Sequence, residues 1–174
     1  MKTKLYYLLI ASTLLLSLKS FSQTSIGGGF AYGSKISTIG INVTGQFFIT
    51  EKIAVAPSFT YYFPNSVDLY VGYDRKWMEA NVDANYYPDL NLIDGKLKPY
   101  GLAGVNYSII DYDYNYNWVT GKYDDGKVSE IGINVGAGAS FDIGKKILPF
   151  AQLKYSIINS YNQAQILVGI RYNL

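Results

Sequence analysis

The sequence contains no cysteine and no histidine among its 174 residues. The absence of cysteine excludes a disulfide framework and a lipid anchor attached through a cysteine thiol. The absence of histidine removes the usual general base, so a serine such as Ser58 or Ser140 lacks the partner that normally activates a hydroxyl nucleophile. We therefore expect no catalysis of the serine-hydrolase type, and nothing in the composition indicates a cofactor.

Long apolar runs are also scarce, and the one that occurs lies near the N-terminus. Two lysines precede it, the run covers residues 5–18, and small residues follow at Ser20 and Ser22, which is typical of a secretory signal peptide. At about 14 residues the run is shorter than the roughly 20 that a membrane-spanning helix requires. We predict that residues 1–22 are a signal peptide and that residues 23–174 form one domain.

The net charge gives no sign of nucleic-acid binding. The formal charge is +2, but Lys2, Lys4 and Lys19 belong to the predicted signal peptide. Without them, basic and acidic side chains nearly balance and no basic patch remains. Nucleic acid is therefore not an expected partner.

What the sequence has in abundance is tyrosine and glycine, at 18 and 17 residues. Eight segments alternate between apolar and polar residues with a period of two, which predicts β-strands that each have one apolar face. If the mature chain enters a membrane, it must do so as strands. The predicted strands are residues 25–33, 38–49, 53–63, 77–88, 97–110, 128–142, 147–158 and 163–174.

The connections between these segments alternate in length. The two longest, residues 64–76 and 111–127, both fall at the same end of an up-and-down arrangement, and short turns such as residues 50–52 fall at the other end. Strands of roughly 10 to 12 residues, with short turns at one end and longer loops at the other, are typical of small barrels that span a membrane.

The two faces of the segments differ in bulk. Small residues such as Ala54, Gly136 and Ser140 crowd the polar face, whereas a soluble barrel needs large apolar side chains inside. We therefore predict an all-β fold, an eight-stranded antiparallel up-and-down transmembrane β-barrel whose apolar face contacts lipid. Aromatic residues near strand ends favour the membrane boundary, although aromatic residues also favour strands in general. These residues are Phe47, Tyr61, Phe63, Tyr86, Tyr107, Phe141, Tyr155 and Tyr172.

Over nearly its full length, the predicted mature chain resembles the small eight-stranded, opacity-protein-like outer-membrane β-barrel domains of Gram-negative bacteria. The resemblance lies in the alternation and in residues 163–174, with Leu174 where such chains usually have phenylalanine. It implies an integral outer-membrane location after secretion across the inner membrane, assembly by the barrel-assembly machinery, contact with lipid and lipopolysaccharide, and a monomeric state. Enzymes of this fold use histidine, which is absent here. The segment that resembles the assembly signal comprises Ile166, Val168, Ile170, Tyr172 and Leu174.

Five charged residues are predicted to share the inward face as a lumen charge network. They can pair across the lumen, act as paired carboxylates in catalysis, or line a conduction pathway, and we favour pairing because both signs of charge are present. Arg171 is expected to bind Glu130 or Asp83, because a guanidinium group matches a carboxylate in shape. The predicted network is Glu79, Asp83, Glu130, Lys154 and Arg171.

The connection at residues 111–127 is rich in tyrosine and asparagine, which suits recognition of a protein surface. We favour strand extensions above the membrane for this connection, and a partner surface and a calcium site formed by Asp111, Asp113 and Asn115 are the alternatives. The candidate recognition residues are Tyr112, Tyr114, Tyr116 and Trp118.

These features predict a structural, adhesive or surface-recognition role without catalysis. An extracellular protein is one candidate partner, and Lys76, Lys122 or Lys127 could hold lipopolysaccharide. The alternative is a small pore or a lateral conduit for hydrophobic or small solutes. Eight strands leave an interior that side chains can just fill, although inward glycines could leave gaps.

Overall fold

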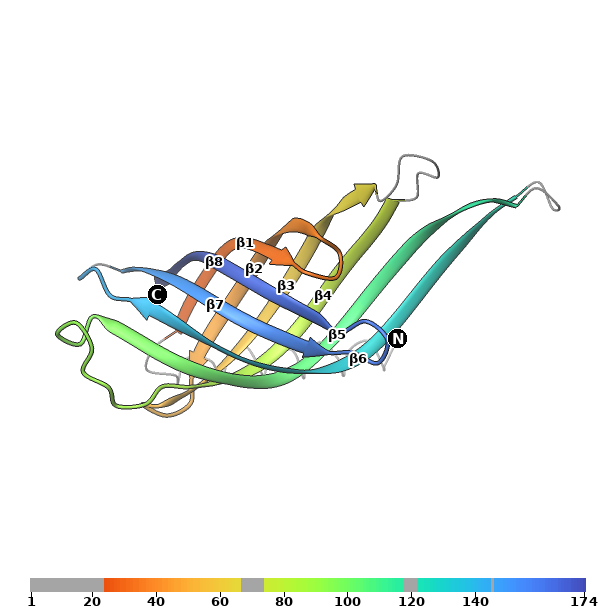
Figure 1. Cartoon of the computed structure of the whole chain (residues 1–174). Coiled ribbons are helices and arrows are strands. Elements are labelled where there is room, and N and C mark those ends of the chain that lie inside the picture. The colour runs from red at the N-terminus through yellow and green to blue at the C-terminus, as the bar shows by residue number, and fades with distance from the viewer. Residues whose placement is uncertain (1–23, 67–73, 118–121, 145) are drawn as a thin grey trace, which may run out of the picture.

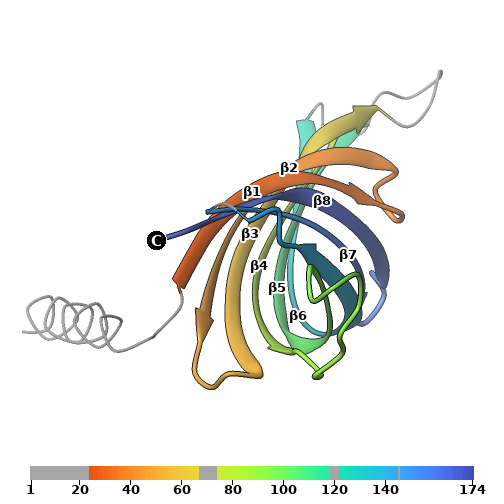
Figure 2. The same cartoon turned by 90° about the vertical axis from the view of Figure 1, so that its left-hand side faces the viewer.

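The computed structural model describes residues 24–66, 74–117, 122–144 and 146–174 and shows a closed antiparallel barrel. Each strand pairs with the next, and β8 closes the barrel against β1 (Figures 1 and 2). The predicted eight-stranded up-and-down barrel is therefore confirmed. The strands are β1 (Thr24–Gly33), β2 (Thr38–Phe48), β3 (Ile53–Ser66), β4 (Asp74–Tyr86), β5 (Leu97–Asn117), β6 (Lys122–Phe141), β7 (Ile147–Ile157) and β8 (Gln163–Asn173).

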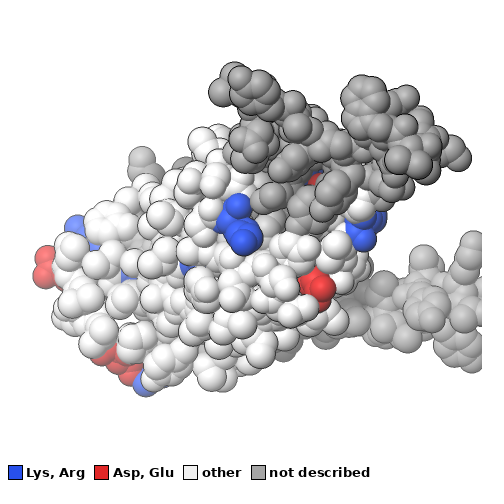
Figure 3. All heavy atoms as spheres, turned by 45° about the vertical axis from the view of Figure 1, so that its right-hand side comes forward, with Lys and Arg blue, Asp and Glu red and all other residues white. Residues whose placement is uncertain are grey.

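Alternation along the strands places an apolar face outside and a largely polar face inside. In β6, Ile133 is 62% exposed whereas the next residue, Asn134, is completely buried. Figure 3 shows a face of the barrel that is mostly uncharged, with only a few charged side chains on it. In water such a surface would be an unusually large apolar patch, so its natural environment is lipid.

The barrel has two dissimilar ends. At the turn end, short connections join β2 to β3 and β6 to β7, and a loop of residues 87–96 joins β4 to β5 (Figure 2). At the hairpin end, β5 and β6 project well beyond the barrel (Figure 1). Within the described ranges, no helix is long and apolar enough to cross a membrane.

The two predicted long connections are shorter than the sequence indicated, because strand pairing continues through most of them. β3 extends to Ser66 and β4 begins at Asp74. β5 and β6 remain paired past Asp111 and Lys127 as far as Asn117 and Lys122, with a bulge in β5. The connection over residues 111–127 is therefore shorter than its sequence bounds, and the favoured expectation of strand extensions above the membrane describes its backbone.

The predicted signal peptide, residues 1–22, lies outside the described residues. Its removal, and the division of the chain at residue 23, stay predictions.

Candidate functional site

A network of amide side chains occupies the middle of the lumen. Asn134 Nδ2 donates to Asn81 Oδ1 at 2.9 Å and to Asp83 Oδ1 at 2.7 Å. Asn106 Nδ2 donates to the same Asn81 oxygen at 2.7 Å, and the Ser156 hydroxyl donates to Asn134 Oδ1 at 2.8 Å. The network joins β4, β5, β6 and β7 across the interior, so these strands are cross-linked by side chains as well as by their backbone ladders.

Two carboxylates and one lysine also lie buried in the lumen, and of these Asp83 belongs to the amide network. Lys154 Nζ is 3.8 Å from Asp83 Oδ2, and both side chains are at most 5% exposed. The Glu79 carboxylate accepts hydrogen bonds from Gln163 Nε2 at 2.8 Å and Gln165 Nε2 at 3.3 Å. A buried charge is costly unless an opposite charge or hydrogen bonds compensate it. Asp83 and Lys154 face each other, and Glu79 accepts two hydrogen bonds.

Arg171 lies in the lumen near the turn end and is held by neutral groups. Its guanidinium donates to Gln46 Oε1 at 3.1 Å, Ser140 Oγ at 3.3 Å and the Tyr100 hydroxyl oxygen at 3.3 Å. The guanidinium carbon also lies 3.9 Å from the centre of the Phe150 ring, a cation–π contact. Arg171 is 2% exposed, so its charge is dispersed over polar and aromatic partners rather than over water.

The expectation that Arg171 binds Glu130 or Asp83 was wrong. Among the described residues, no carboxylate lies within ion-pair distance of Arg171. The strand registers explain this, because Arg171 pairs with Leu148 near the turn end whereas Glu130 pairs with Ser108 toward the hairpin end. Arg171 and Glu130 both belong to the inward-facing set of residues, but they lie at different heights along the barrel axis and so do not meet.

The five predicted lumen charges therefore do not form one network. Glu79, Asp83 and Lys154 lie close together in the lumen, and Arg171 forms a separate group. Glu130 is half-buried, and no described side chain forms an ion pair with it. It sits in β6 beyond the point at which β7 stops pairing, at the rim of the barrel rather than within it.

The hairpin end of the lumen is closed by large side chains that the sequence reasoning did not single out. Trp77 and Tyr62 are completely buried, with ring centres 6.4 Å apart in an edge-to-face arrangement. Trp77 Nε1 donates to Ser108 Oγ at 3.2 Å, and Ile110 and Ile158 belong to the same buried apolar cluster. Small residues were expected on the inward face, so Trp77 was not predicted to lie inside. The signal was present in the sequence, because Trp77 lies two positions before Glu79 and therefore shares its inward face.

Aromatic side chains also line the turn end of the lumen. The rings of Tyr87 and Tyr100 are 5.0 Å apart, and those of Phe48 and Tyr87 are 5.3 Å apart. Gln46 Nε2 donates to the Tyr87 hydroxyl oxygen, and the Tyr100 hydroxyl donates to Gln152 Oε1 at 3.1 Å. Together with Arg171, these rings occupy the interior next to the mouth at this end.

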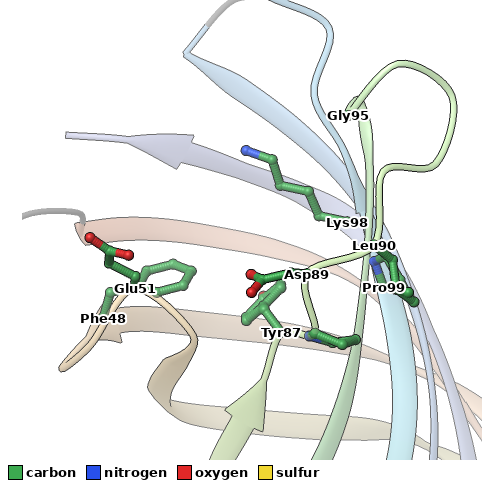
Figure 4. Close-up of a pocket in the computed structure, with 9 residues that line it drawn as sticks. Phe48, Glu51, Tyr87, Asp89, Leu90, Gly95, Lys98 and Pro99 are labelled. Carbon is green, nitrogen blue, oxygen red and sulfur yellow. The ribbon is translucent and has the colours of Figure 1, made fainter.

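A hollow of about 310 Å³ lies at the turn-end mouth, between the β2–β3 turn and the loop after β4 (Figure 4). An ion pair between Lys52 and Asp89 stands beside it, and Asp89 raises the pKa of Lys52 above its ordinary value. The backbone N–H of Gly144 donates to Asp142 and lowers the pKa of that carboxyl group. The hollow is shallow and its charges are solvated, so it is poorly suited to chemistry. Its lining residues are Phe48, Glu51, Tyr87, Pro88, Asp89, Leu90, Gly95, Lys98 and Pro99.

The segment that resembles an assembly signal faces outward. Four of its residues are between 46% and 57% exposed in β8, where they can contact lipid, and Leu174 follows the strand. Recognition of this segment by the assembly machinery stays a prediction. The four residues are Ile166, Val168, Ile170 and Tyr172.

The predicted recognition residues lie on the projecting part of β5. Tyr112, Tyr114 and Tyr116 belong to the strand, and Trp118 lies outside the described residues. In the parts of the chain that the structure describes, no cluster of three acidic side chains could hold a metal ion. The side chains of Asp113 and Asn115 lie outside the described part of the structure, so the calcium alternative stays a prediction.

Comparisons with known proteins show the same architecture. No family model matches the chain, and no curated protein sequence matches it. Among solved structures, the N-terminal β-barrel domain of Pseudomonas aeruginosa OprF is similar, with a TM-score of 0.66, 18% identity, and coverage of 88% of this chain and 98% of that domain. A major outer-membrane protein from Thermus thermophilus has a TM-score of 0.64, 12% identity, and coverage of 87% of this chain and 99% of that protein.

The attachment invasion locus protein Ail of Yersinia pestis is also similar, with a TM-score of 0.58, 16% identity, and coverage of 87% of this chain and 97% of Ail. At these identities the likeness shows the fold. The closed barrel, its apolar outer surface and these neighbours define the class of integral outer-membrane β-barrels, and the predicted resemblance is confirmed at that level.

Proposed function

We propose that this protein is a membrane-anchored surface-recognition protein that displays the β5–β6 hairpin and has no catalytic role. The observation that carries the proposal is the length of the hairpin. β6 pairs with β7 only from Ile133 onward, yet it continues beside β5 out to Lys122. At about 3.3 Å per residue, the part beyond β7 measures on the order of 30 Å along the strand.

The filled lumen favours recognition over transport. Trp77 and Tyr62 occupy the hairpin end, amides and an ion pair fill the middle, and Arg171 is packed on Phe150 near the turn end. An eight-stranded barrel has an interior that side chains can just fill, and here large side chains are present at both ends. The interior thus supports the barrel as a rigid anchor for the hairpin.

The lumen also supports the absence of catalysis. Glu79 is bound by two glutamine side chains, and Asp83 by Asn134 and Lys154. A general base needs a free path to its substrate, and these carboxylates are buried with their oxygens engaged. The chain also supplies no histidine.

The charge of the hairpin narrows the class of partner. A structure of Ail is described as a complex with a heparin analogue, sucrose octasulfate. Residues 111–127 of the present chain contain four aspartates and two lysines, so the hairpin carries net negative charge and would repel such a polyanion. The tyrosine-rich sequence favours a protein surface instead.

Shortening the hairpin tests the proposed function. Asp111 and Lys127 are cross-strand partners, so residues 112–126 can be replaced by Asn-Gly, which closes a tight two-residue turn. Cells that display the full-length protein should be retained under flow on protein-coated surfaces or on one another, and cells with the shortened hairpin should not. Heat-modifiable migration should be unchanged, because the barrel and its lumen are intact. Equal retention of both strains would refute the proposal.

The pore alternative predicts a different result in planar bilayers. We expect no discrete conductance from the wild-type chain, because both ends of the lumen are filled. Trp77→Ala with Tyr62→Ala removes the largest side chains at the hairpin end and is the matched variant for detecting leakage. Regular single-channel steps from the wild-type protein would instead support a pore.

A further inference from the structure

Within the described part of the chain, the projecting part of β6 is a free strand edge. Residues 122–131 pair with β5 on one side, and on the other side no described strand accompanies them, because β7 begins to pair only at Ile133 (Figure 1). The bulge in this hairpin lies in β5, so β6 keeps its regular alternation. A free edge presents unpaired N–H and C=O groups and is a template for another strand.

The order of charges along this edge is self-complementary. When two identical strands pair antiparallel about a two-fold axis, directly opposite side chains lie on the same face of the sheet. Residues on one face alternate along the strand, so the two opposite residues are always an even number of positions apart in the sequence. One residue therefore lies at the axis, opposite its own counterpart. With Gly126 at that centre, Lys122 lies opposite Glu130 of the second copy, and Asp125 lies opposite Lys127. The two-fold axis repeats both pairs, so four pairs of opposite charge result.

Neighbouring registers lack this complementarity. Centring the pair on Lys127 places that lysine opposite itself and Asp124 opposite Glu130, and centring it on Asp125 places two aspartates face to face. Like charges directly opposite each other destabilise a strand pair, and opposite charges stabilise it. The charge pattern therefore selects the register centred on Gly126 over its neighbours.

The symmetry also determines how the two barrels would be oriented. A two-fold axis that relates antiparallel strands is perpendicular to their sheet, and the hairpin continues the barrel wall, so this axis is roughly perpendicular to the barrel axis (Figure 1). The second barrel then points in the opposite direction, and the two lipid-facing surfaces lie at opposite ends of the pair. Two copies in one membrane would instead bring their β6 strands together in parallel.

We infer that the edge of β6 at residues 122–131 binds the same edge of a second copy in an opposing membrane, in the antiparallel register centred on Gly126. The inference rests on the proposed function and names its partner, another molecule of this chain. Within a single membrane the protein can remain a monomer. The expected consequence is self-association of cells or vesicles that display it.

Charge reversal in reconstituted vesicles tests the inference. Full-length protein is inserted into vesicles of phosphatidylcholine and phosphatidylglycerol, and clustering is followed by light scattering. Glu130→Lys turns an attractive pair into a repulsive one at two symmetric positions and should slow clustering about tenfold, and Lys122→Glu should do the same. Mixing the two kinds of vesicle restores opposite charges across the pair and should restore clustering. Glu51→Lys makes the same charge change at the turn end and should have no effect.

The results separate this inference from the proposed function. It is overturned if correctly folded wild-type vesicles do not cluster, if Glu130→Lys vesicles cluster at the wild-type rate, or if the mixture stays dispersed. Any of these results leaves hairpin-dependent adhesion to other surfaces intact. Only equal adhesion of the full-length and shortened hairpins removes the proposed function itself.

Discussion

Lys154→Met should lower the free energy of unfolding by about 3 to 5 kcal/mol, the range seen when one member of a buried ion pair is removed. Lys154 is 1% exposed and lies beside the carboxylate of Asp83. Its removal leaves Asp83 and Glu79 buried without the lysine that counters their charge. Methionine has a similar length, so the packing changes little and the electrostatic loss dominates. Urea unfolding of the protein in lipid vesicles, followed by tryptophan fluorescence, measures the change.

Two further variants test whether the loss of stability comes from the buried ion pair. Asp83→Asn in the same chain removes the unpaired charge and should recover part of the loss, because its amide can still contact Asn134. Lys98→Met is the matched control, since Lys98 pairs with Asp142 at 3.5 Å but is 53% exposed, and exposed pairs contribute only about 0 to 1 kcal/mol. If Lys154→Met and Lys98→Met cost the same, water screens the lumen and the buried pair has no special role.

Gly29→Ala should destabilise the barrel by about 3 kcal/mol or more, at or above the upper end of the usual range for overpacking. Gly29 of β1 pairs directly with Gly169 of β8, at the seam that closes the barrel. A Cβ atom on Gly29 would lie 2.1 Å from the backbone oxygen of Val168, and one on Gly169 would lie 2.3 Å from the backbone oxygen of Gly28. The obstruction is backbone, so the strands themselves must separate.

The matched control for this prediction is Gly101→Ala in β5, where an added Cβ meets no atom within 4 Å. We expect Gly101→Ala to refold to the heat-modifiable form as the wild type does, and Gly29→Ala to give a reduced yield of that form. A normal yield and unfolding midpoint for Gly29→Ala would show that the seam can widen without cost, contrary to the close approach described here.

The sequence determined the central part of each strand and which face each residue there occupies. Successive side chains of a strand point to opposite sides, so the period of two is a local property that needs no knowledge of distant partners. Ile133 and Asn134 illustrate this, since their opposite environments follow from their order in the chain. The inward phase of Glu79, Asp83, Lys154 and Arg171 could be predicted for the same reason.

Only the tertiary structure decided which inward residues meet. Contacts across a lumen depend on the stagger between strands and on position along the barrel axis, and alternation carries no information about either. Arg171 therefore meets Gln46, Ser140 and Tyr100 rather than the carboxylates expected for it. The projecting hairpin was likewise decided by tertiary structure, because β5 and β6 continue beyond the barrel by pairing their backbone groups with each other. The free edge of β6 follows from the point at which β7 stops pairing with it, and alternation does not reveal that point.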